Sequence, residues 1–234
     1  MKLGVVSLGC VKNQVDTEEM LSFLQKDGFE FTGNPAEAEV LVVNTCGFIT
    51  SAKEESIDAI LEMAAYKEQG ACRLLCVTGC LAQRYGQELL EQIPEIDVLT
   101  GVTNYPQLAG YIREALSGAR TGSTKREADF TGCGRVLTTR PYTAYVRISE
   151  GCDNVCAYCA IPLIRGPYRS RPEADILDEM RTLADQGAKE QILIAQDTSR
   201  YGSDLKGTSL PRLLDQAAQI PGIHWLRVLY CYPE

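Results

Sequence analysis

The sequence predicts an α/β protein in which a doubly wound parallel sheet is followed by the first half of a (β/α) barrel. Short apolar runs alternate with segments whose apolar residues recur at helical spacing, which is the pattern of strand–helix–strand units. The links between these segments are short, as expected for helices that join successive parallel strands. The same alternation resumes after residue 142, so a second parallel sheet is expected there.

Four apolar runs mark the strands of the first half, over residues 3–8, 40–43, 74–77 and 96–99. The second run reads Val-Leu-Val-Val without interruption. A continuous β-branched run is typical of a parallel strand that is buried on both faces. Helices are therefore expected on both sides of this sheet.

Helix starts are assigned from polar residues that satisfy exposed backbone N–H groups. Asp16 or Thr17 is expected to begin the first helix, and Ser51 with Glu54 has the spacing of a capping box for the second. Pro106 suits the first turn of a later helix that runs to residue 116. The second helix is expected to bury an apolar stripe made of Ile57, Ile60, Leu61 and Ala64.

Three cysteines each follow a predicted strand directly, and we call Cys10, Cys46 and Cys80 the strand-end cysteines. The carboxyl ends of parallel strands meet at one edge of a sheet, which is where ligand sites form. Three thiolates gathered at one place are suited to an iron–sulfur cluster. The sequence therefore predicts one shared cluster site from residues that lie far apart in the chain.

The second half repeats the strand–helix pattern. Residues 118–141 are rich in Gly, Thr, Ser and charge, and they are expected to connect a domain of residues 1–117 to one of residues 142–234. In the second domain, strands are expected at 142–148, 191–195 and 225–229, with helices between them. We expect a barrel that is truncated after its third strand, and a chain that is inactive by itself.

Three further cysteines lie close together in a C-x-x-x-C-x-x-C motif, and we call Cys152, Cys156 and Cys159 the loop cysteines. Three thiolates at this spacing can bind three irons of a 4Fe–4S cluster and leave the fourth iron open. A zinc site is disfavoured because the single histidine, His224, is distant in the sequence. Zinc and inert thiols remain the alternatives.

The composition narrows the class of protein and its partners. The formal net charge is −8, which argues against the clustered basic residues of a nonspecific nucleic-acid site and suits a basic partner. Ten cysteines without an export signal indicate metal or redox chemistry in the cytoplasm rather than disulfides. No apolar run approaches the roughly 20 residues of a membrane span.

Taken together, these motifs resemble the methylthiotransferase family of radical S-adenosylmethionine (SAM) enzymes. The loop cysteines are similar to the family's signature loop, in which an aromatic residue, here Tyr158, precedes the third cysteine. Residues 7–13 read Ser-Leu-Gly-Cys-Val-Lys-Asn. With residues 159–166 and 195–202, they resemble the branch of the family that modifies a ribosomal protein. Val11 departs from the proline that is common at that position, which carries no ligand.

The resemblance implies a transferase with two 4Fe–4S clusters and SAM as cofactors. The cluster on the loop cysteines would bind and reductively cleave SAM, and the radical formed would remove hydrogen from the β-carbon of an aspartate of ribosomal small-subunit protein twelve. The cluster on the strand-end cysteines would supply or carry the sulfur. Electrons would come from a donor such as flavodoxin or ferredoxin. No side chain is expected to act as an acid or base.

Four side chains are expected to contact SAM or the substrate: Tyr158, Arg165, Gln196 and Asp197. Tyr158 would contact the adenine, and Gln196 and Asp197 would meet polar groups of SAM at the end of a barrel strand. Arg165, like its neighbours Arg169 and Arg171, is suited to holding a carboxylate. The alternatives are packing for Tyr158, loop capping for Gln196 and Asp197, and solvated surface positions for the arginines.

Two other functions remain open on the sequence alone. The first is a methylthiotransferase that acts on adenosine in transfer RNA. The second is a noncatalytic module in which iron–sulfur or zinc sites only staple the fold. Structural metal sites are normally fully ligated, whereas both cysteine sets offer three thiolates, so the module is the weaker alternative. The acidic charge favours a basic protein over RNA as the substrate.

Overall fold

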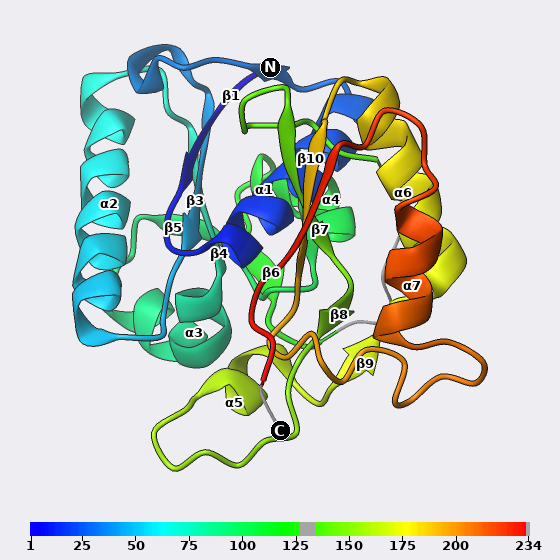
Figure 1. Cartoon of the computed structure of the whole chain (residues 1–234). Helices are drawn as coiled ribbons and strands as arrows, with labels where there is room; N and C mark the ends of the chain where they lie inside the picture. The colour runs from blue at the N-terminus through cyan, green and yellow to red at the C-terminus, as the bar shows by residue number, and fades with distance from the viewer. Residues whose placement is uncertain (127–133, 233–234) are drawn as a thin grey trace. The chain divides into compact units, whose positions relative to one another are not determined.

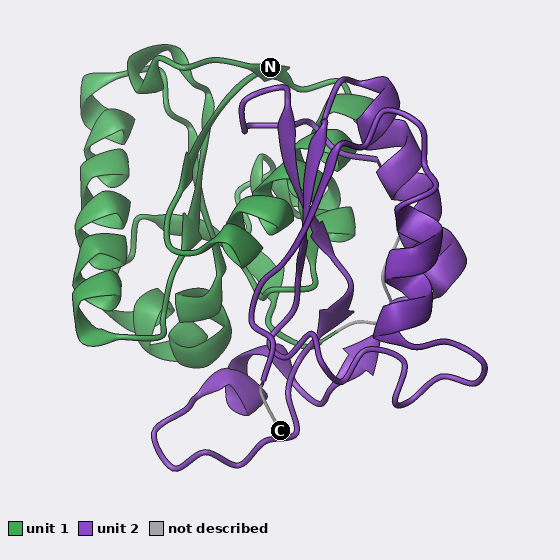
Figure 2. Cartoon of the chain, viewed as in Figure 1, with its two compact units in different colours: residues 1–129 green, residues 130–234 purple. Residues whose placement is uncertain are grey.

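The computed structural model describes residues 1–126 and 134–232. The chain forms two compact units, Met1–Asp129 and Phe130–Glu234 (Figure 2). Both contain parallel strands joined by helices (Figure 1), which confirms the predicted α/β class. The division between the units falls inside the connection expected at residues 118–141. Among the helices of the described residues, none is long and apolar enough to cross a membrane.

The first unit is built on a six-stranded sheet in the order β2-β1-β3-β4-β5-β6. Every neighbouring pair is parallel. The strand order changes direction between β1 and β3, and such a switch point is where open α/β sheets bind ligands. The strands are β1 (Lys2–Ser7), β2 (Glu30–Phe31), β3 (Val40–Thr45), β4 (Leu74–Gly79), β5 (Ile96–Thr100) and β6 (Thr121–Ser123).

Helices cover both faces of this sheet, as the uninterrupted apolar run of β3 predicts. Leu41 and Val43 point to a core that includes Ile60 of α2 and Leu81 of α3. Val40 and Val42 point to the opposite core, which α1 and α4 complete. The helices are α1 (Val11–Lys26), α2 (Thr50–Gln69), α3 (Cys80–Gln92) and α4 (Leu108–Ala115), with 3-10 turns at Pro35–Glu37 and Tyr105–Gln107.

The predicted starts of the first two helices are wrong. The α1 helix begins at Val11 with Cys10 as its N-cap, so Asp16 and Thr17 lie buried inside the helix. The α2 helix begins at Thr50, and no side chain caps it, so Ser51 and Glu54 do not form the expected box. In both cases the helix starts where the short connection from the strand allows, and this tertiary constraint overrides the local capping signal.

Two short strands of the first unit carry no clear sequence signal. The β2 strand has two residues, and the β6 strand lies inside the connection expected at residues 118–141. Arg120 fixes the approach to β6, because its guanidinium donates to the carbonyl oxygens of Ile96, at 2.8 Å, and Leu90, at 3.1 Å. Residues 118–126 are therefore partly structure and not only a link.

The second unit has a three-stranded parallel sheet in the order β11-β10-β7. A short antiparallel pair, β8 with β9, follows β7. The pair and the α5 helix lie on either side of the loop cysteines, outside the strands expected from the sequence. The strands are β7 (Thr143–Arg147), β8 (Ser149–Glu150), β9 (Arg169–Ser170), β10 (Glu190–Ile194) and β11 (Trp225–Val228). The helices are α5 (Ile161–Arg165), α6 (Glu173–Asp185) and α7 (Leu210–Ala217).

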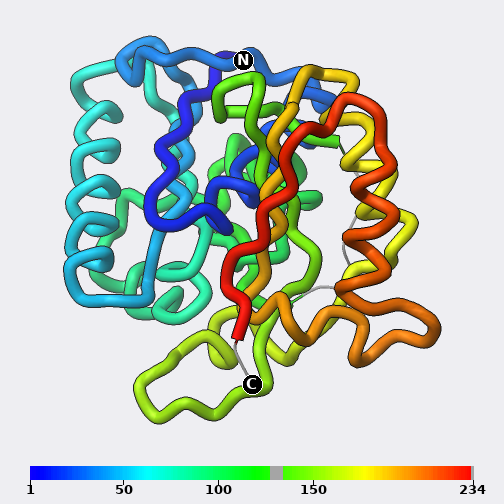
Figure 3. The backbone as a smooth tube through the Cα atoms, in the orientation of Figure 1, coloured from blue at the N-terminus to red at the C-terminus, as the bar shows by residue number. Residues whose placement is uncertain are grey.

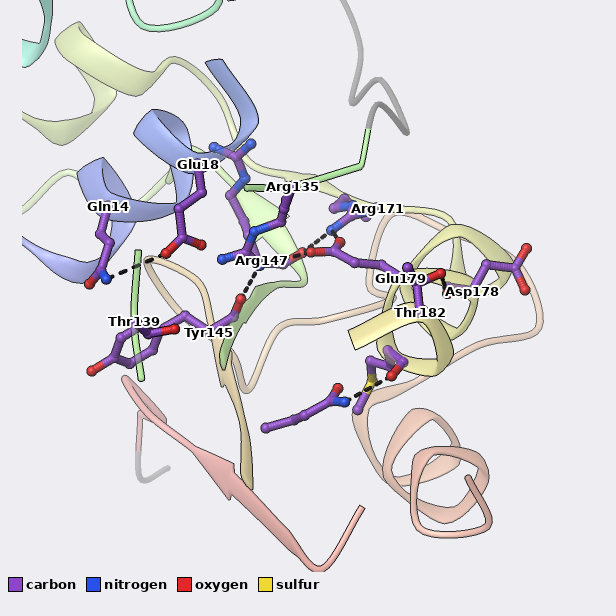
Figure 4. Close-up of polar contacts among 12 residues, drawn as sticks. Gln14, Glu18, Arg135, Thr139, Tyr145, Arg147, Arg171, Asp178, Glu179 and Thr182 are labelled. Carbon is purple, nitrogen blue, oxygen red and sulfur yellow. Dashed lines mark hydrogen bonds and ion pairs between the residues drawn. The ribbon is translucent and has the colours of Figure 1, made fainter. Parts of the chain in front are cut away.

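A nearly buried carboxylate on α6 joins two arginines of the second unit (Figure 4). The Oε1 atom of Glu179 lies 2.9 Å from Arg135 Nη1, and its Oε2 atom lies 2.5 Å from Arg171 Nη1. Arg171 also donates to the carbonyl oxygen of Arg147, at 2.8 Å. Glu179 therefore fastens the chain around residue 135 and the end of β9 to α6.

We expect Glu179→Gln to destabilise the chain, because it leaves Arg135 and Arg171 without their common anion. Removing one partner of a buried ion pair costs about 3–5 kcal/mol of unfolding free energy, measured by urea denaturation at neutral pH. The exposed pair of Asp178 with Arg181 is the control, and Asp178→Asn should change stability by about 0–1 kcal/mol. Equal losses in the two variants would contradict this role.

The contribution of Glu179 should also depend on pH. Burial would raise its pKa, but the charges of Arg171 and Arg135 outweigh burial and hold the pKa below 4.5. A carboxyl whose pKa falls on folding stabilises the fold above its unfolded pKa and loses this effect as the pH falls through the folded pKa. The stability difference between the parent and Glu179→Gln should therefore shrink below pH 4.5.

Neighbouring residues of α2 test where its apolar face lies. The expected stripe is half right, since Ile60 and Ala64 are buried, whereas Ile57 and Leu61 are 37% and 50% exposed. Ile60→Ala should lower the free energy of unfolding by about 2–5 kcal/mol, because it opens a cavity in the core. Leu61→Ala should change it by about 0.5 kcal/mol or less. Urea denaturation of both variants measures the contrast.

Candidate functional site

The strand-end cysteines lie at adjoining strand ends of the first unit. Ser7 of β1 pairs with Asn44 of β3, and Thr45 of β3 pairs with Gly79 of β4, so the three strands end nearly level. Cys10 caps α1, Cys46 directly follows β3, and Cys80 is the first residue of α3. The sheet therefore brings the three loops together beside the switch point between β1 and β3.

The loops pack closely around these cysteines. A Cβ atom added to Gly9, which has φ +93°, would lie 2.8 Å from the Cβ atom of Cys46 and 3.1 Å from its Sγ atom. A Cβ atom on Gly47 would meet the backbone of Leu81 at 2.8 Å. Cys80 is buried, Cys46 is partly buried and Cys10 is exposed. The group therefore extends from the interior to the surface of the unit.

Cys46 is held by a serine that the sequence analysis did not find. The backbone N–H of Cys46 donates to the Ser56 hydroxyl at 2.9 Å, and the hydroxyl lies 3.0 Å from the Cys46 carbonyl oxygen and 2.8 Å from that of Ala52. Ser56 is fully buried on α2. A serine within a helix carries no local signal for this contact, because the partner is ten residues away.

The described residues contain no three Cys, His, Asp or Glu side chains that already lie close enough to bind one metal ion. The structure thus places the ligand loops side by side, and the ligand set itself stays a prediction. The donor chemistry fits an iron–sulfur cluster, because each of the three adjoining loops carries one thiol.

The loop cysteines of the second unit lie in a segment that extends away from the sheet (Figure 3). Its base is held where the N–H of Cys152 donates to Gly166 O at 3.1 Å. Gly151, with φ +74°, admits no side chain there, since a Cβ atom would lie 2.0 Å from Pro167 O. The N–H of Cys159 donates to Cys156 O at 3.0 Å, so a tight turn joins these two cysteines.

A buried carboxylate, Glu150, clamps the base of the cysteine loop. Its Oε1 atom accepts from the N–H of Gly151 at 3.1 Å. Its Oε2 atom lies 3.0 Å from Arg147 Nη1 and 3.2 Å from Arg165 Nη1. Arg165 is 1% exposed, so it is not a solvated surface arginine. A contact from Arg165 to SAM stays a prediction, while the carboxylate that it holds in this structure is that of Glu150.

A second set of contacts joins the start of the cysteine loop to Tyr168 and Arg200. Asp153 accepts from the N–H of Tyr168 at 2.9 Å and pairs with Arg200 at 3.4 Å. The Arg200 guanidinium lies over the Tyr168 ring, 4.9 Å from its centre. Burial raises the pKa of Tyr168, so its hydroxyl stays neutral. These contacts link the cysteine loop to the segment that follows β10.

The other predicted SAM contacts have different surroundings. Asp197 is buried after β10, and its Oδ1 atom accepts from the N–H of Ser199 at 3.1 Å and from its hydroxyl at 2.5 Å, which is the loop-capping alternative. Gln196, beside it, is partly buried. Tyr158 is 84% exposed, which does not fit simple packing. The SAM contacts of all three residues stay predictions.

The remaining described cysteines lie outside the two predicted sets. Cys72 and Cys76 are buried, and burial raises the pKa of both thiols. A raised pKa disfavours the thiolate that binds metals. Cys231 is exposed near the end of the chain. Cys133 lies outside the described residues.

Two family models match the chain. The model described as uncharacterized protein family UPF0004 matches residues 2–101, which contain the strand-end cysteines. The model described as the radical SAM superfamily matches residues 146–224, which contain the loop cysteines. Both predicted cluster sites thus lie inside matched regions.

The chain is also similar to curated proteins named ribosomal protein uS12 methylthiotransferase RimO. It is 51% identical to the protein of Clostridium tetani, over 100% of this chain and 53% of that protein. It is 52% identical to the protein of Desulforamulus reducens, over 99% of this chain and 53% of that protein. It is 50% identical to the protein of Symbiobacterium thermophilum, over 100% of this chain and 49% of that protein. The chain spans about half the length of the curated relatives it matches.

Solved structures share the fold at low sequence identity. The radical SAM methyltransferase TsrM from Kitasatospora setae, with tryptophan and a SAM analogue bound, matches with a TM-score of 0.60 and 14% identity, over 92% of this chain and 50% of that one. TsrM with cobalamin and a [4Fe-4S] cluster bound matches with a TM-score of 0.55 and 16% identity. This match covers 92% of this chain and 50% of that one. At these identities the likeness supports the fold alone.

Gly9 and Gly28 provide a matched test of the site around Cys46. Both have positive φ, +93° and +87°, so Ala should strain the backbone of each by about 1–2 kcal/mol. Only at Gly9 would the added methyl group collide with Cys46, since Gly28 has nothing within 4 Å. After anaerobic reconstitution with iron and sulfide, Gly9→Ala should retain less iron than Gly28→Ala. Equal iron contents would show that Cys46 is not a ligand or that it adjusts freely.

Proposed function

Because the chain belongs to the radical SAM methylthiotransferase family, we propose that it adds a methylthio group to the β-carbon of an aspartate of ribosomal small-subunit protein twelve. The main support is the sequence identity of 51–52% with curated uS12 methylthiotransferases. The aligned region extends over 99–100% of this chain and includes both cysteine sets. The placement of the strand-end cysteines at a sheet switch point supports the proposal independently.

In this proposal the loop cysteines hold one 4Fe–4S cluster and the strand-end cysteines hold the other. When bound, the clusters and SAM supply the radical chemistry and the sulfur that amino-acid side chains lack. The chain's own residues position these groups. Glu150 fixes the entry of the cysteine loop through Gly151 and Arg165, and Asp153 fixes its start through Tyr168 and Arg200.

Four side chains are proposed to orient SAM or the substrate. Tyr158 is exposed beside the loop cysteines, where an aromatic face is free to stack on an adenine. Arg165 lies at the base of the same loop, and Gln196 and Asp197 follow the carboxyl end of β10. Ligands of parallel α/β folds bind at such strand ends. None of these groups is proposed to transfer a proton.

The partners follow from the proposed reaction and from charge. The net charge of −8 suits an encounter with a basic ribosomal protein. A reduced flavodoxin or ferredoxin is proposed as the electron donor, and the cytoplasm as the location, because the ribosome is assembled there. Direct binding of nucleic acid is not part of the proposal.

We expect this chain, completed with the remaining half of a curated relative and reconstituted anaerobically, to cleave SAM when it is reduced. Methionine and 5′-deoxyadenosine would be measured by chromatography. Cys156→Ala removes one of three ligands of the loop site and should abolish the cleavage. Cys231→Ala, an exposed cysteine outside both predicted sets, should leave cleavage unchanged. Cleavage that persists in Cys156→Ala would refute the assignment of the SAM site.

The substrate is tested in a bacterium that lacks its own uS12 methylthiotransferase. Expression of this chain, completed with the remaining half of a curated relative, should restore the methylthio mass on an aspartate of uS12, as measured by mass spectrometry. Transfer RNA from the same cells would be digested and analysed in parallel. Methylthio-adenosine in place of modified uS12 would move the protein to the transfer-RNA branch.

A further inference from the structure

One side chain of the first unit contacts all three loops that carry the strand-end cysteines. The Asn13 amide nitrogen donates to the carbonyl oxygen of Leu8 at 3.0 Å and to that of Thr45 at 2.8 Å. Its amide oxygen lies 3.4 Å from the Sγ atom of Cys80. Leu8 and Thr45 lie two residues before Cys10 and one residue before Cys46, so a single amide links the three ligand loops.

The chemistry of these contacts requires an amide in one orientation. An amide NH₂ group has two hydrogens, and the two carbonyl oxygens of Leu8 and Thr45 accept both. The amide oxygen must then face Cys80. A carboxylate at this position would set its oxygens against two carbonyl oxygens. A smaller side chain would remove the donor to the buried carbonyl oxygen of Thr45, which costs free energy at a buried position.

The backbone around Asn13 is itself held against the sheet. The Asn13 carbonyl oxygen accepts from the amide nitrogen of Asn44, on β3, at 3.0 Å. That nitrogen also lies 2.8 Å from the hydroxyl of Thr17, which in turn lies 2.7 Å from the hydroxyl of Ser7 on β1. The first turns of α1 are thereby fixed to two strands of the sheet, and Asn13 holds the loops from a rigid base.

We propose that Asn13 is the positioning residue of the strand-end site and sets the spacing of its three thiols. The inference rests on the proposed function, since it assumes that Cys10, Cys46 and Cys80 bind one metal group. No chemical step is assigned to Asn13. It acts through Leu8, Thr45 and Cys80, and its loss should weaken metal binding more than it weakens the fold.

The test measures metal affinity apart from catalysis. The protein used is the full chain in which the three loop cysteines are changed to Ala. In this variant the strand-end site is the one predicted cluster site that remains. Cobalt(II) is titrated anaerobically, and the absorption band of cobalt bound to thiolate reports binding. Asn13→Asp, which keeps the shape and removes both donated hydrogen bonds, should weaken cobalt binding about 10–100-fold, as outer-shell substitutions commonly do.

Asn104 supplies the matched control in the same unit. It is also fully buried, it accepts from the N–H of Gly101 at 3.1 Å, and it donates to Lys125 O at 3.1 Å. Asn104→Asp therefore removes one donated, partly buried hydrogen bond beside β5. It should bind cobalt as the parent does. Urea denaturation of both variants measures how much each substitution weakens the fold itself.

The outcomes separate this inference from the proposed function. Failure of the parent to bind cobalt through Cys10, Cys46 and Cys80 would overturn the site itself. A parent that binds, with Asn13→Asp binding equally well, would overturn only the role of Asn13. Equal losses of cobalt affinity in Asn13→Asp and Asn104→Asp would also overturn it. If Asn13→Asp and Asn13→Ala both fail to fold while Asn104→Asp folds, Asn13 serves the whole unit rather than the thiols, and the inference fails.

Discussion

Parallel strand pairing is the constraint on which the first unit depends. When strands run in the same direction, all their carboxyl ends lie at one edge, and every connection must return along a face of the sheet. The pairing of β1 with β3 and of β3 with β4 therefore sets Cys10, Cys46 and Cys80 at adjoining loops, although they are far apart in the sequence. Hydrogen bonds from Asn13 and Ser56 then refine what the sheet brings together.

The second unit positions its cysteines by another means. Its loop cysteines are already close in the sequence, so the fold needs only to fix the base of one loop. Buried ion pairs do this, because a charge removed from water must keep its partner in place. Glu150 holds the loop entry through Arg147 and Arg165, while Glu179 fastens β9 to α6 through Arg171. Each carboxylate holds the backbone segments that carry its arginine partners.

The two units thus apply one rule of α/β proteins to two different sets of ligands. In each, the cysteines predicted to hold a cluster lie beyond the carboxyl ends of parallel strands, although the short antiparallel strand β8 intervenes in the second unit. The match to two family models, one for each unit, agrees with this division. The residues proposed to hold each cluster can therefore be examined within a single unit.

The sequence by itself determined the α/β class, the longer strands of both sheets, and the six cysteines of interest, because hydrophobic period and cysteine spacing are local signals. It did not determine where α1 and α2 begin, that Ile57 and Leu61 face solvent, or that β6 extends the first sheet. Nor did it indicate that Asn13, Ser56 and Glu150 hold the cysteine loops. Only the tertiary structure decided these features, because their hydrogen-bond partners and packing surfaces come from segments that are distant in the chain.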